Sequence, residues 1–156
     1  MTRSKVDLPS LYMVLSFTVS ILISFYDPTE LPFLEEIGTV LLALGSLIFL
    51  YVLFYLRSGF FGETEPKLKS LITKGPYRFC RHPLYLSFII IALGINLMLK
   101  SALGIIFTFA LSIPSAVYRG RIEDKLLRNK FGEEWENYAD KVGFLLPKLR
   151  KQRTKA

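Results

Sequence analysis

The stretch of sequence that decides the fold is PLYLSFIIIALGINLMLKSALGIIFTFALSIPSAV, residues 83–117. It holds two apolar runs, 83–99 and 102–117, which are separated only by Lys100 and Ser101. Each run is close to the shortest helix that crosses the ~30 Å hydrocarbon core of a bilayer. Neither run has the polar face that a helix at the surface of a water-soluble protein needs. The pattern therefore predicts an antiparallel helical hairpin whose two ends return to one membrane face.

Two more apolar runs precede this hairpin. Residues 11–26 and 37–56 carry no charged side chain, and 51% of the 156 residues are hydrophobic. We therefore expect an all-α membrane protein that forms one domain, 1–156, with short cytosolic or interfacial helices after the last span. The expected segments are four transmembrane helices near 10–26, 37–57, 83–99 and 102–118, a cytosolic cap over 119–147 and a basic tail over 148–156.

The charges predict how the chain is oriented in the membrane. Residues 27–36 contain four acidic residues and no Lys or Arg, whereas residues 57–82 contain six basic residues. Eleven of the twenty basic residues follow residue 118. Because basic residues favour the cytoplasmic side, we expect both termini and the 57–82 loop to be cytoplasmic. Contact with anionic lipid headgroups explains this basic face better than nucleic-acid binding does.

Four ionisable residues are expected to converge where the hairpin meets water: His82, Tyr85, Arg119 and Glu123. His82 and Tyr85 are three residues apart, and Arg119 and Glu123 are four apart, so each pair shares a helix face. Taken alone, the second pair is typical of a surface ion pair, and a single histidine is typical of an interfacial residue. Ionisable groups are costly near a bilayer, so four together favour a functional site.

The residue types restrict the chemistry of that site. An arginine and a helix N-terminus favour a carboxylate or phosphate, and aromatic rings suit a purine or a sulfonium cation. No G-x-G-x-x-G turn follows a strand, and one histidine cannot build a usual zinc site. Arg78 and Arg81 beside Cys80 could lower its pKa, but a small, partly buried thiol is the favoured interpretation. We therefore expect no metal, and a pocket for a charged amphipathic molecule.

Two motifs resemble a known family. GPYRFCRHPLY, residues 75–85, is followed by Arg119, Glu123 and FGEEWENY, residues 131–138. Together they resemble the isoprenylcysteine carboxyl methyltransferases and their phospholipid methyltransferase relatives over about residues 66–147. The resemblance implies an integral membrane enzyme that uses S-adenosyl-L-methionine. The cofactor would lie between the last two membrane helices and the C-terminal cytosolic helices.

The same resemblance implies roles for individual residues. Arg119 would face the methyl-accepting group as the catalytic residue. The sequence departs from the family pattern at Ser87, where glycine is frequent. It also departs at Asp124, where phospholipid methyltransferases tend to have glutamate. The implied cofactor-binding residues are Lys69, Ser70, Leu71, Ile72, Tyr77, His82, Pro83, Leu84, Tyr85 and Glu123.

The sequence thus predicts methyl transfer to a hydrophobic or lipid-borne acceptor, such as an isoprenylcysteine-like carboxylate, at the cytoplasmic face. Three alternatives stay open: a phospholipid N-methyltransferase, a nicotinamide-dependent membrane reductase with a similar helical layout, and a non-catalytic membrane scaffold. Apart from its acceptor, the expected partners are membrane lipids, and the expected location is the cell membrane of a prokaryote. The sequence does not name the acceptor or the oligomeric state.

Overall fold

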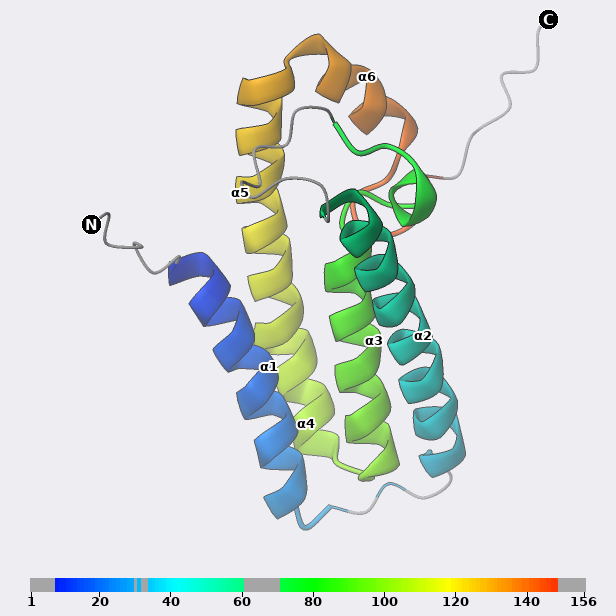
Figure 1. Ribbon diagram of the computed structural model, residues 1–156. Helices are drawn as coiled ribbons and strands as arrows, with labels where there is room; N and C mark the ends of the chain where they lie inside the picture. Colours follow the sequence, from blue (N-terminus) through cyan, green and yellow to red (C-terminus); the bar gives the residue numbers. More distant parts are fainter. Residues whose placement is uncertain (1–7, 30, 32–33, 61–70, 149–156) are drawn as a thin grey trace, which may run out of the picture.

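The protein is a bundle of long helices with a smaller helical cap at one end (Figure 1). The computed structural model describes residues 8–29, 31, 34–60 and 71–148. Within these ranges there are helices and no strands, which confirms the all-α prediction. The helices are α1 (Leu8–Tyr26), α2 (Glu35–Phe60), the short 3-10 helix η1 (Gly75–Arg78), α3 (Pro83–Met98), α4 (Ala102–Phe107), the π-helical turn η2 (Thr108–Ser112), α5 (Ile113–Phe131) and α6 (Glu133–Lys141).

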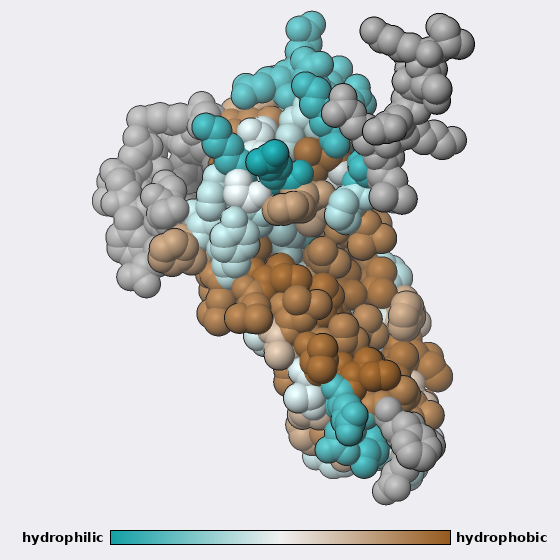
Figure 2. Space-filling view, turned by 90° about the vertical axis from the view of Figure 1, so that its right-hand side faces the viewer, coloured by the Kyte–Doolittle hydropathy of each residue, from teal (hydrophilic) through white to brown (hydrophobic). Residues whose placement is uncertain are grey.

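In the described part of the chain, three helices are long and apolar enough to cross a membrane: 8–26, 35–56 and the continuous helix 102–131. The remaining predicted span, 83–99, corresponds to α3, whose 16 residues rise about 24 Å. Figure 2 shows an apolar band between two hydrophilic ends of the molecule. Along α1 and α2, large apolar side chains such as Leu22, Val40 and Phe54 are exposed, as lipid contact requires. The structure is therefore that of a membrane protein.

The last span continues as one helix beyond its apolar part. The helical spacing of Arg119 and Glu123 predicts this continuation, and α5 runs without a break to Phe131. The helix departs from regular α-helical geometry in the π-helical turn η2 just before Pro114. Proline has no backbone N–H to donate to the preceding turn, which is consistent with a widened turn at this place. The long helix carries Arg119 and Glu123 directly out of the apolar bundle.

Small residues let α2 and α3 pack backbone against backbone. A Cβ atom added to Gly94 would lie 2.5 Å from the backbone nitrogen of Leu42, and one added to Gly38 would lie 2.4 Å from that of Met98. Such approaches are typical of membrane helices, where close packing takes the place of the hydrophobic effect. This contact places α2 along α3 and brings the end of α2 to the cap (Figure 1).

A column of buried polar side chains joins α1 to the rest of the bundle. Asn96 of α3 donates to the hydroxyls of Ser20 and Thr108, at 3.0 and 2.7 Å, and accepts from Ser24 at 2.8 Å. One turn or more away, Ser16 and Ser115 share a hydrogen bond of 2.7 Å. In a bilayer such bonds each contribute about 0.6–2 kcal/mol to helix association. The hydropathy pattern of the sequence did not indicate this column.

At the opposite end from the cap, the α1–α2 connection is tied to the α3–α4 turn. Asp27 accepts hydrogen bonds from the Ser101 hydroxyl at 2.6 Å and from the backbone N–H of Leu103 at 2.8 Å. The bond from Ser101 holds the pKa of Asp27 well below its usual range. Ser101 in turn caps α4 by accepting from the N–H of Gly104. The charged end of α1 is thus fixed against the turn of the apolar hairpin.

The glycine contact between α2 and α3 yields a stability prediction. Gly94→Leu places a side chain into the backbone of α2, so the free energy of unfolding should fall by about 1–3 kcal/mol or more. Ala43→Leu is the matched control, because Ala43 lies on the exposed face of α2. Thermal denaturation in detergent micelles measures both variants. Equal stability of the two variants would contradict the close packing described here.

Candidate functional site

A cavity of about 270 Å³ opens at the end of the bundle where α3 begins. Its walls come from the end of α2, the segment around η1, the first turn of α3, the outer half of α5, and α6. The lining residues are Leu56, Leu71, Ile72, Tyr77, Arg81, His82, Pro83, Leu84, Tyr85, Glu123, Asp124, Leu127, Phe131, Trp135 and Tyr138.

Most of the residues that the sequence singles out meet at this cavity. Leu71, Ile72, Tyr77, the run 82–85 and Glu123 all line it. Lys69 and Ser70 lie outside the residues that the structure describes.

Arg119 lies beside the cavity and is not part of its lining. Its Nε donates a 2.7 Å hydrogen bond to the hydroxyl of Ser10 on α1. Its positive charge still acts on Tyr85, which does line the cavity. Arg119 therefore connects α1 with the edge of the site.

His82 is the most enclosed polar residue of the cavity wall. It precedes Pro83, the first residue of α3, and its own backbone is not helical, with φ −124° and ψ 61°, since the following proline disfavours the helical region. Only 4% of the residue is exposed. Its ring stacks on Tyr85 with centroids 5.3 Å apart and contacts Phe144 at 4.6 Å. The imidazole is thus held in one plane by aromatic rings on both sides.

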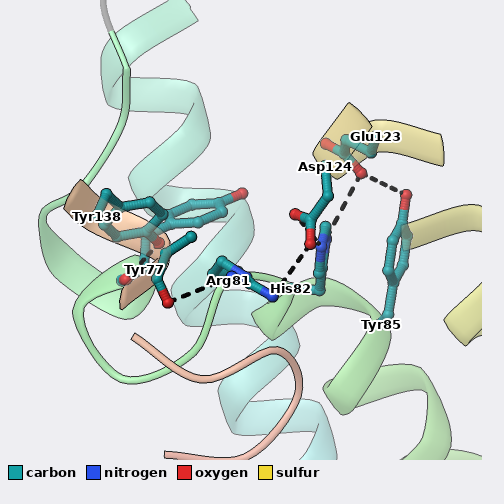
Figure 3. A network of polar contacts seen from close by, with 8 residues as sticks. Tyr77, Arg81, His82, Tyr85, Glu123, Asp124 and Tyr138 are labelled. Carbon is teal, nitrogen blue, oxygen red and sulfur yellow. Dashed lines mark hydrogen bonds and ion pairs between the residues drawn. The ribbon is translucent and has the colours of Figure 1, made fainter. Parts of the chain in front are cut away.

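Asp124 connects the first turn of α3 to α5. One of its oxygens, Oδ1, lies 2.9 Å from His82 Nε2, and the other, Oδ2, lies 3.1 Å from a terminal nitrogen of Arg81 (Figure 3). The Arg81 guanidinium also lies over the Trp135 ring at 5.4 Å. Because this pair is mostly buried, it is screened less than a surface ion pair. It ties α3, α5 and α6 together at the cavity.

Glu123 presents its carboxylate to the same space. Its Oε2 accepts a 2.8 Å hydrogen bond from the Tyr85 hydroxyl and lies 3.7 Å from His82 Nδ1. The Glu123 side chain is 42% exposed, so it also reaches solvent at the mouth of the site. Glu123 and Asp124 therefore flank the imidazole on its two nitrogen atoms (Figure 3).

A short backbone pairing joins the segment before α3 to the segment after α6 beside the site. The N–H of Arg81 donates to the carbonyl of Gly143 at 2.9 Å, and that of His82 donates to the carbonyl of Phe144 at 3.1 Å. Cys80 and Gly143 form a parallel bridge. These bonds satisfy backbone groups in the irregular stretch before α3 and position the Phe144 ring against His82.

Two tyrosines of the cap are held neutral by their surroundings. Burial, aided by the negative charge of Glu123, raises the pKa of Tyr77 to about 12. Burial likewise raises the pKa of Tyr138 well above its usual range. The Tyr138 hydroxyl keeps its proton at neutral pH and donates a hydrogen bond of 2.7 Å to the carbonyl of Tyr77. This bond fastens α6 to η1.

Several lining residues were not recognised as site residues in the sequence. Arg81 directly precedes His82, and Asp124 directly follows Glu123. The opposite charges of these two neighbours were a signal that could have identified them as site residues. Trp135 and Tyr138 are buried at 8% and 9% exposure and also line the cavity. The remaining unforeseen lining residues are Leu56, Leu127 and Phe131.

Residues 33–134 match the sequence model of the family described as phospholipid methyltransferase. The match spans more than half of the chain and includes the cavity residues from Leu56 to Phe131. The chain belongs to the phospholipid methyltransferase family. This confirms the resemblance stated from the two motifs.

Curated relatives of this family member match about half of its length. A nickel-cobalt-cadmium resistance protein of Alcaligenes xylosoxydans xylosoxydans is 36% identical over 53% of the chain and 38% of its own length. A probable protein-S-isoprenylcysteine O-methyltransferase of Oryza sativa subsp. indica is 43% identical over 50% of the chain and 41% of its own length. The corresponding enzyme of Saccharomyces cerevisiae is 34% identical over 49% of the chain and 32% of its own length. The chain spans about two fifths or less of each of these relatives.

Metal ligands do not gather in the part of the chain that the structure describes. No group of three or more His, Cys, Asp or Glu side chains there could hold a metal ion. The two ring nitrogens of His82 face the carboxylates of Glu123 and Asp124, and the Cys80 side chain is buried.

Cys80 provides a test of how tightly the site is closed. Burial raises the pKa of its thiol to about 11, so the neighbouring arginines do not activate it. Since only the thiolate reacts, and on the order of one thiol in 10⁴ would be ionised at pH 7, maleimide labelling of the folded protein should be very slow. Protein unfolded in SDS is the control and should label at once on its single cysteine. Rapid labelling of folded protein would show that the 80–82 and 143–144 pairing opens readily.

Proposed function

We propose that this protein is an S-adenosyl-L-methionine-dependent methyltransferase that acts on a hydrophobic or lipid-borne acceptor at the membrane face. One observation carries the proposal. At the end of an apolar helical bundle, the cavity combines aromatic rings with the carboxylates of Glu123 and Asp124. Membership of the phospholipid methyltransferase family supports the same reaction class.

The chemistry of the lining suits this cofactor. Carboxylates and aromatic faces attract a sulfonium cation, and Tyr77, Tyr85 and Trp135 supply such faces next to Glu123. Two buried N–H donors of the wall, Arg81 Nε and Trp135 Nε1, find no hydrogen-bond partner in the described structure. A buried donor without a partner costs about 1–3 kcal/mol, so a ligand that brings acceptor atoms suits this wall.

The residues proposed to hold the cofactor are those that the family resemblance implies and that line the cavity. They are Leu71, Ile72, Tyr77, His82, Pro83, Leu84, Tyr85 and Glu123. When bound, the cofactor would supply the methyl group. The chain would bind and orient both reactants and exclude water, and positioning of this kind contributes strongly to bimolecular reactions.

A carboxylate is the acceptor that the surroundings of Arg119 favour. Arg119 lies beside the cavity at the α1–α5 junction, where a charge-assisted hydrogen bond would orient a carboxylate oxygen. A carboxylate is already ionised at neutral pH and needs no general base. The rice and yeast relatives are named as isoprenylcysteine O-methyltransferases, which supports an isoprenylcysteine-like acceptor.

The second candidate is a phospholipid amine, which the family description favours. An amine must lose a proton during methylation, and Glu123 or His82 would have to accept it. Both residues line the cavity, so the described site could serve either acceptor.

We further propose that α3 crosses the membrane together with the three longer helices. Its contact with α2 extends along the helix, and its two ends lie at the two hydrophilic ends of the bundle. Basic residues are concentrated in the segments 57–82 and 119–156, which supports a cytoplasmic site with both termini on that side. Location in the cell membrane of a prokaryote stays a prediction.

Cofactor binding tests the proposed function. Detergent-purified protein should bind radiolabelled S-adenosylmethionine and not NADPH, and Glu123→Gln should weaken binding about tenfold, or about 1.4 kcal/mol. Glu134→Gln, an exposed substitution on α6, is the matched control and should bind like the parent. Binding of NADPH would favour the membrane reductase, and binding of neither molecule would favour a scaffold. Parent-like affinity of Glu123→Gln would remove Glu123 from the cofactor site.

The acceptor role of Arg119 is tested by turnover. Lysine cannot reproduce the planar fork of arginine, so Arg119→Lys should lower kcat or raise the acceptor KM by a combined 10- to 100-fold, about 1.4–2.7 kcal/mol. Cofactor affinity should stay near the parent value. The assay follows methyl transfer from labelled S-adenosylmethionine to N-acetyl-S-farnesylcysteine.

Ser10→Ala is the control for this variant, since it removes the partner of Arg119 on α1 without changing the guanidinium. It should keep turnover within about threefold of the parent. If Arg119→Lys and Ser10→Ala lowered turnover equally, Arg119 would be a link between helices. Full turnover of Arg119→Lys would also refute the acceptor role.

A further inference from the structure

The surroundings of His82 determine which of its two nitrogens carries a proton. Asp124 Oδ1 lies 2.9 Å from Nε2, and its second oxygen binds the guanidinium of Arg81. A carboxylate has no proton to donate, so the proton of the short bond must come from Nε2. In a neutral imidazole, Nδ1 is then an acceptor.

Nδ1 faces a second acceptor. It lies 3.7 Å from Glu123 Oε2, which is longer than a direct hydrogen bond between the two atoms. The Tyr85 hydroxyl already donates to that oxygen, and a carboxylate oxygen can accept more than one bond. With Nε2 protonated, Nδ1 and Oε2 are two acceptors that can share one hydrogen-bond donor from outside the protein.

Packing contributes to holding the imidazole in place. The ring is stacked on Tyr85 with the planes 11° apart, and Phe144 contacts it from another side. The backbone of Gly120 comes so close that an added Cβ would lie 3.3 Å from His82 Cδ2. Asp124 is therefore not the only group that holds the ring. Its separate effect is to select the tautomer, as a buried aspartate does for other histidines.

We propose that Asp124 is a positioning residue that fixes His82 as the Nε2–H tautomer, so that Nδ1 and Glu123 Oε2 form a two-acceptor site for one N–H or O–H donor of a bound ligand. This inference rests on the proposed function only for the source of the donor. The donor is an amine or hydroxyl group of the adenosyl cofactor, or an N–H of the acceptor. In this role Asp124 acts on the ligand's donor through His82.

The chain offers an unusually direct measurement, because His82 is its only histidine. Protein labelled with ¹⁵N-histidine, purified in micelles with a histidine-free tag, gives NMR signals from this imidazole alone. The parent should show a proton-bearing Nε2 and an unprotonated Nδ1. An imidazolium, or a proton on Nδ1, would overturn the proposal.

Substitution of Asp124 then tests the cause. Asp124→Asn can donate from its amide to Nε2, so the proton should move to Nδ1 or exchange between the two nitrogens. Asp124→Glu keeps a carboxylate and should restore the parent tautomer. Asp140→Asn changes an exposed aspartate on α6 and is the matched control. An unchanged tautomer in Asp124→Asn would refute the positioning role.

Ligand titrations identify the source of the donor. S-adenosylhomocysteine or N-acetyl-S-farnesylcysteine is added separately to the labelled parent, and the ligand that donates to Nδ1 should shift that signal. Its affinity should fall about tenfold in Asp124→Asn and recover in Asp124→Glu. If neither ligand moved the Nδ1 signal, the two-acceptor site would be wrong.

The tautomer measurement is made without ligand, so it separates this inference from the proposed function. A parent with the expected tautomer that binds no S-adenosylmethionine would leave the role of Asp124 intact and refute the proposed cofactor. A parent that binds S-adenosylmethionine but lacks the expected tautomer would support the proposed cofactor and refute the role of Asp124.

Discussion

The structure depends on the contact of Asp124 with Arg81 and His82, which joins the two ends of an apolar hairpin. The hairpin leaves the cap at Pro83 and returns along the continuous helix 102–131. If these side chains did not contact one another, the charges of Asp124 and Arg81 and the imidazole of His82 would be mostly buried without partners. Burial of unpaired charges is strongly unfavourable. With the contact in place, the first turn of α3, the outer half of α5 and the ring of Trp135 surround one cavity.

The bundle below the cavity is held by interactions suited to a lipid environment. Gly38 and Gly94 allow α2 and α3 to touch along their backbones, and Asn96 bonds α1 to α3 and η2. Apolar packing gains little where the surrounding solvent is itself apolar, so close contact and hydrogen bonding determine how the helices associate. A rigid support of this kind holds the short polar cap at one end, where any ligand would have to bind.

Much of this arrangement could be predicted from the sequence because its signals are local. Long uncharged runs predicted the helices, and the spacing of His82, Tyr85 and Glu123 around one hairpin predicted their convergence. The helical spacing of Arg119 and Glu123 predicted that a helix continues beyond residue 118, as α5 does. That Arg119 faces the methyl-accepting group stays a prediction, and its bond to Ser10 depends on the tilt of α1, which no local pattern encodes.

The rest of the site depends on contacts between distant segments. The pairing of residues 80–82 with 143–144 joins two irregular stretches that carry no strand signal. The inward position of Trp135 and Tyr138 follows from the bond of Tyr138 to the Tyr77 carbonyl, since the same helix could otherwise lie on the membrane surface. Asp124 was noticed only as a departure from a family pattern, whereas its ion pair with Arg81 and its hydrogen bond with His82 explain why an acid is needed there.

The central claim is that the cavity between α3, α5 and α6 holds the cofactor. Ultraviolet cross-linking of methyl-labelled S-adenosylmethionine to the detergent-solubilised protein, followed by mass spectrometry of the peptides, locates the bound molecule. The account predicts adducts within residues 71–85 and 123–138, which are lost when unlabelled S-adenosylhomocysteine is added in excess. Specific adducts confined to the apolar parts of α1 and α2, or no competable adduct at saturating cofactor, would contradict it.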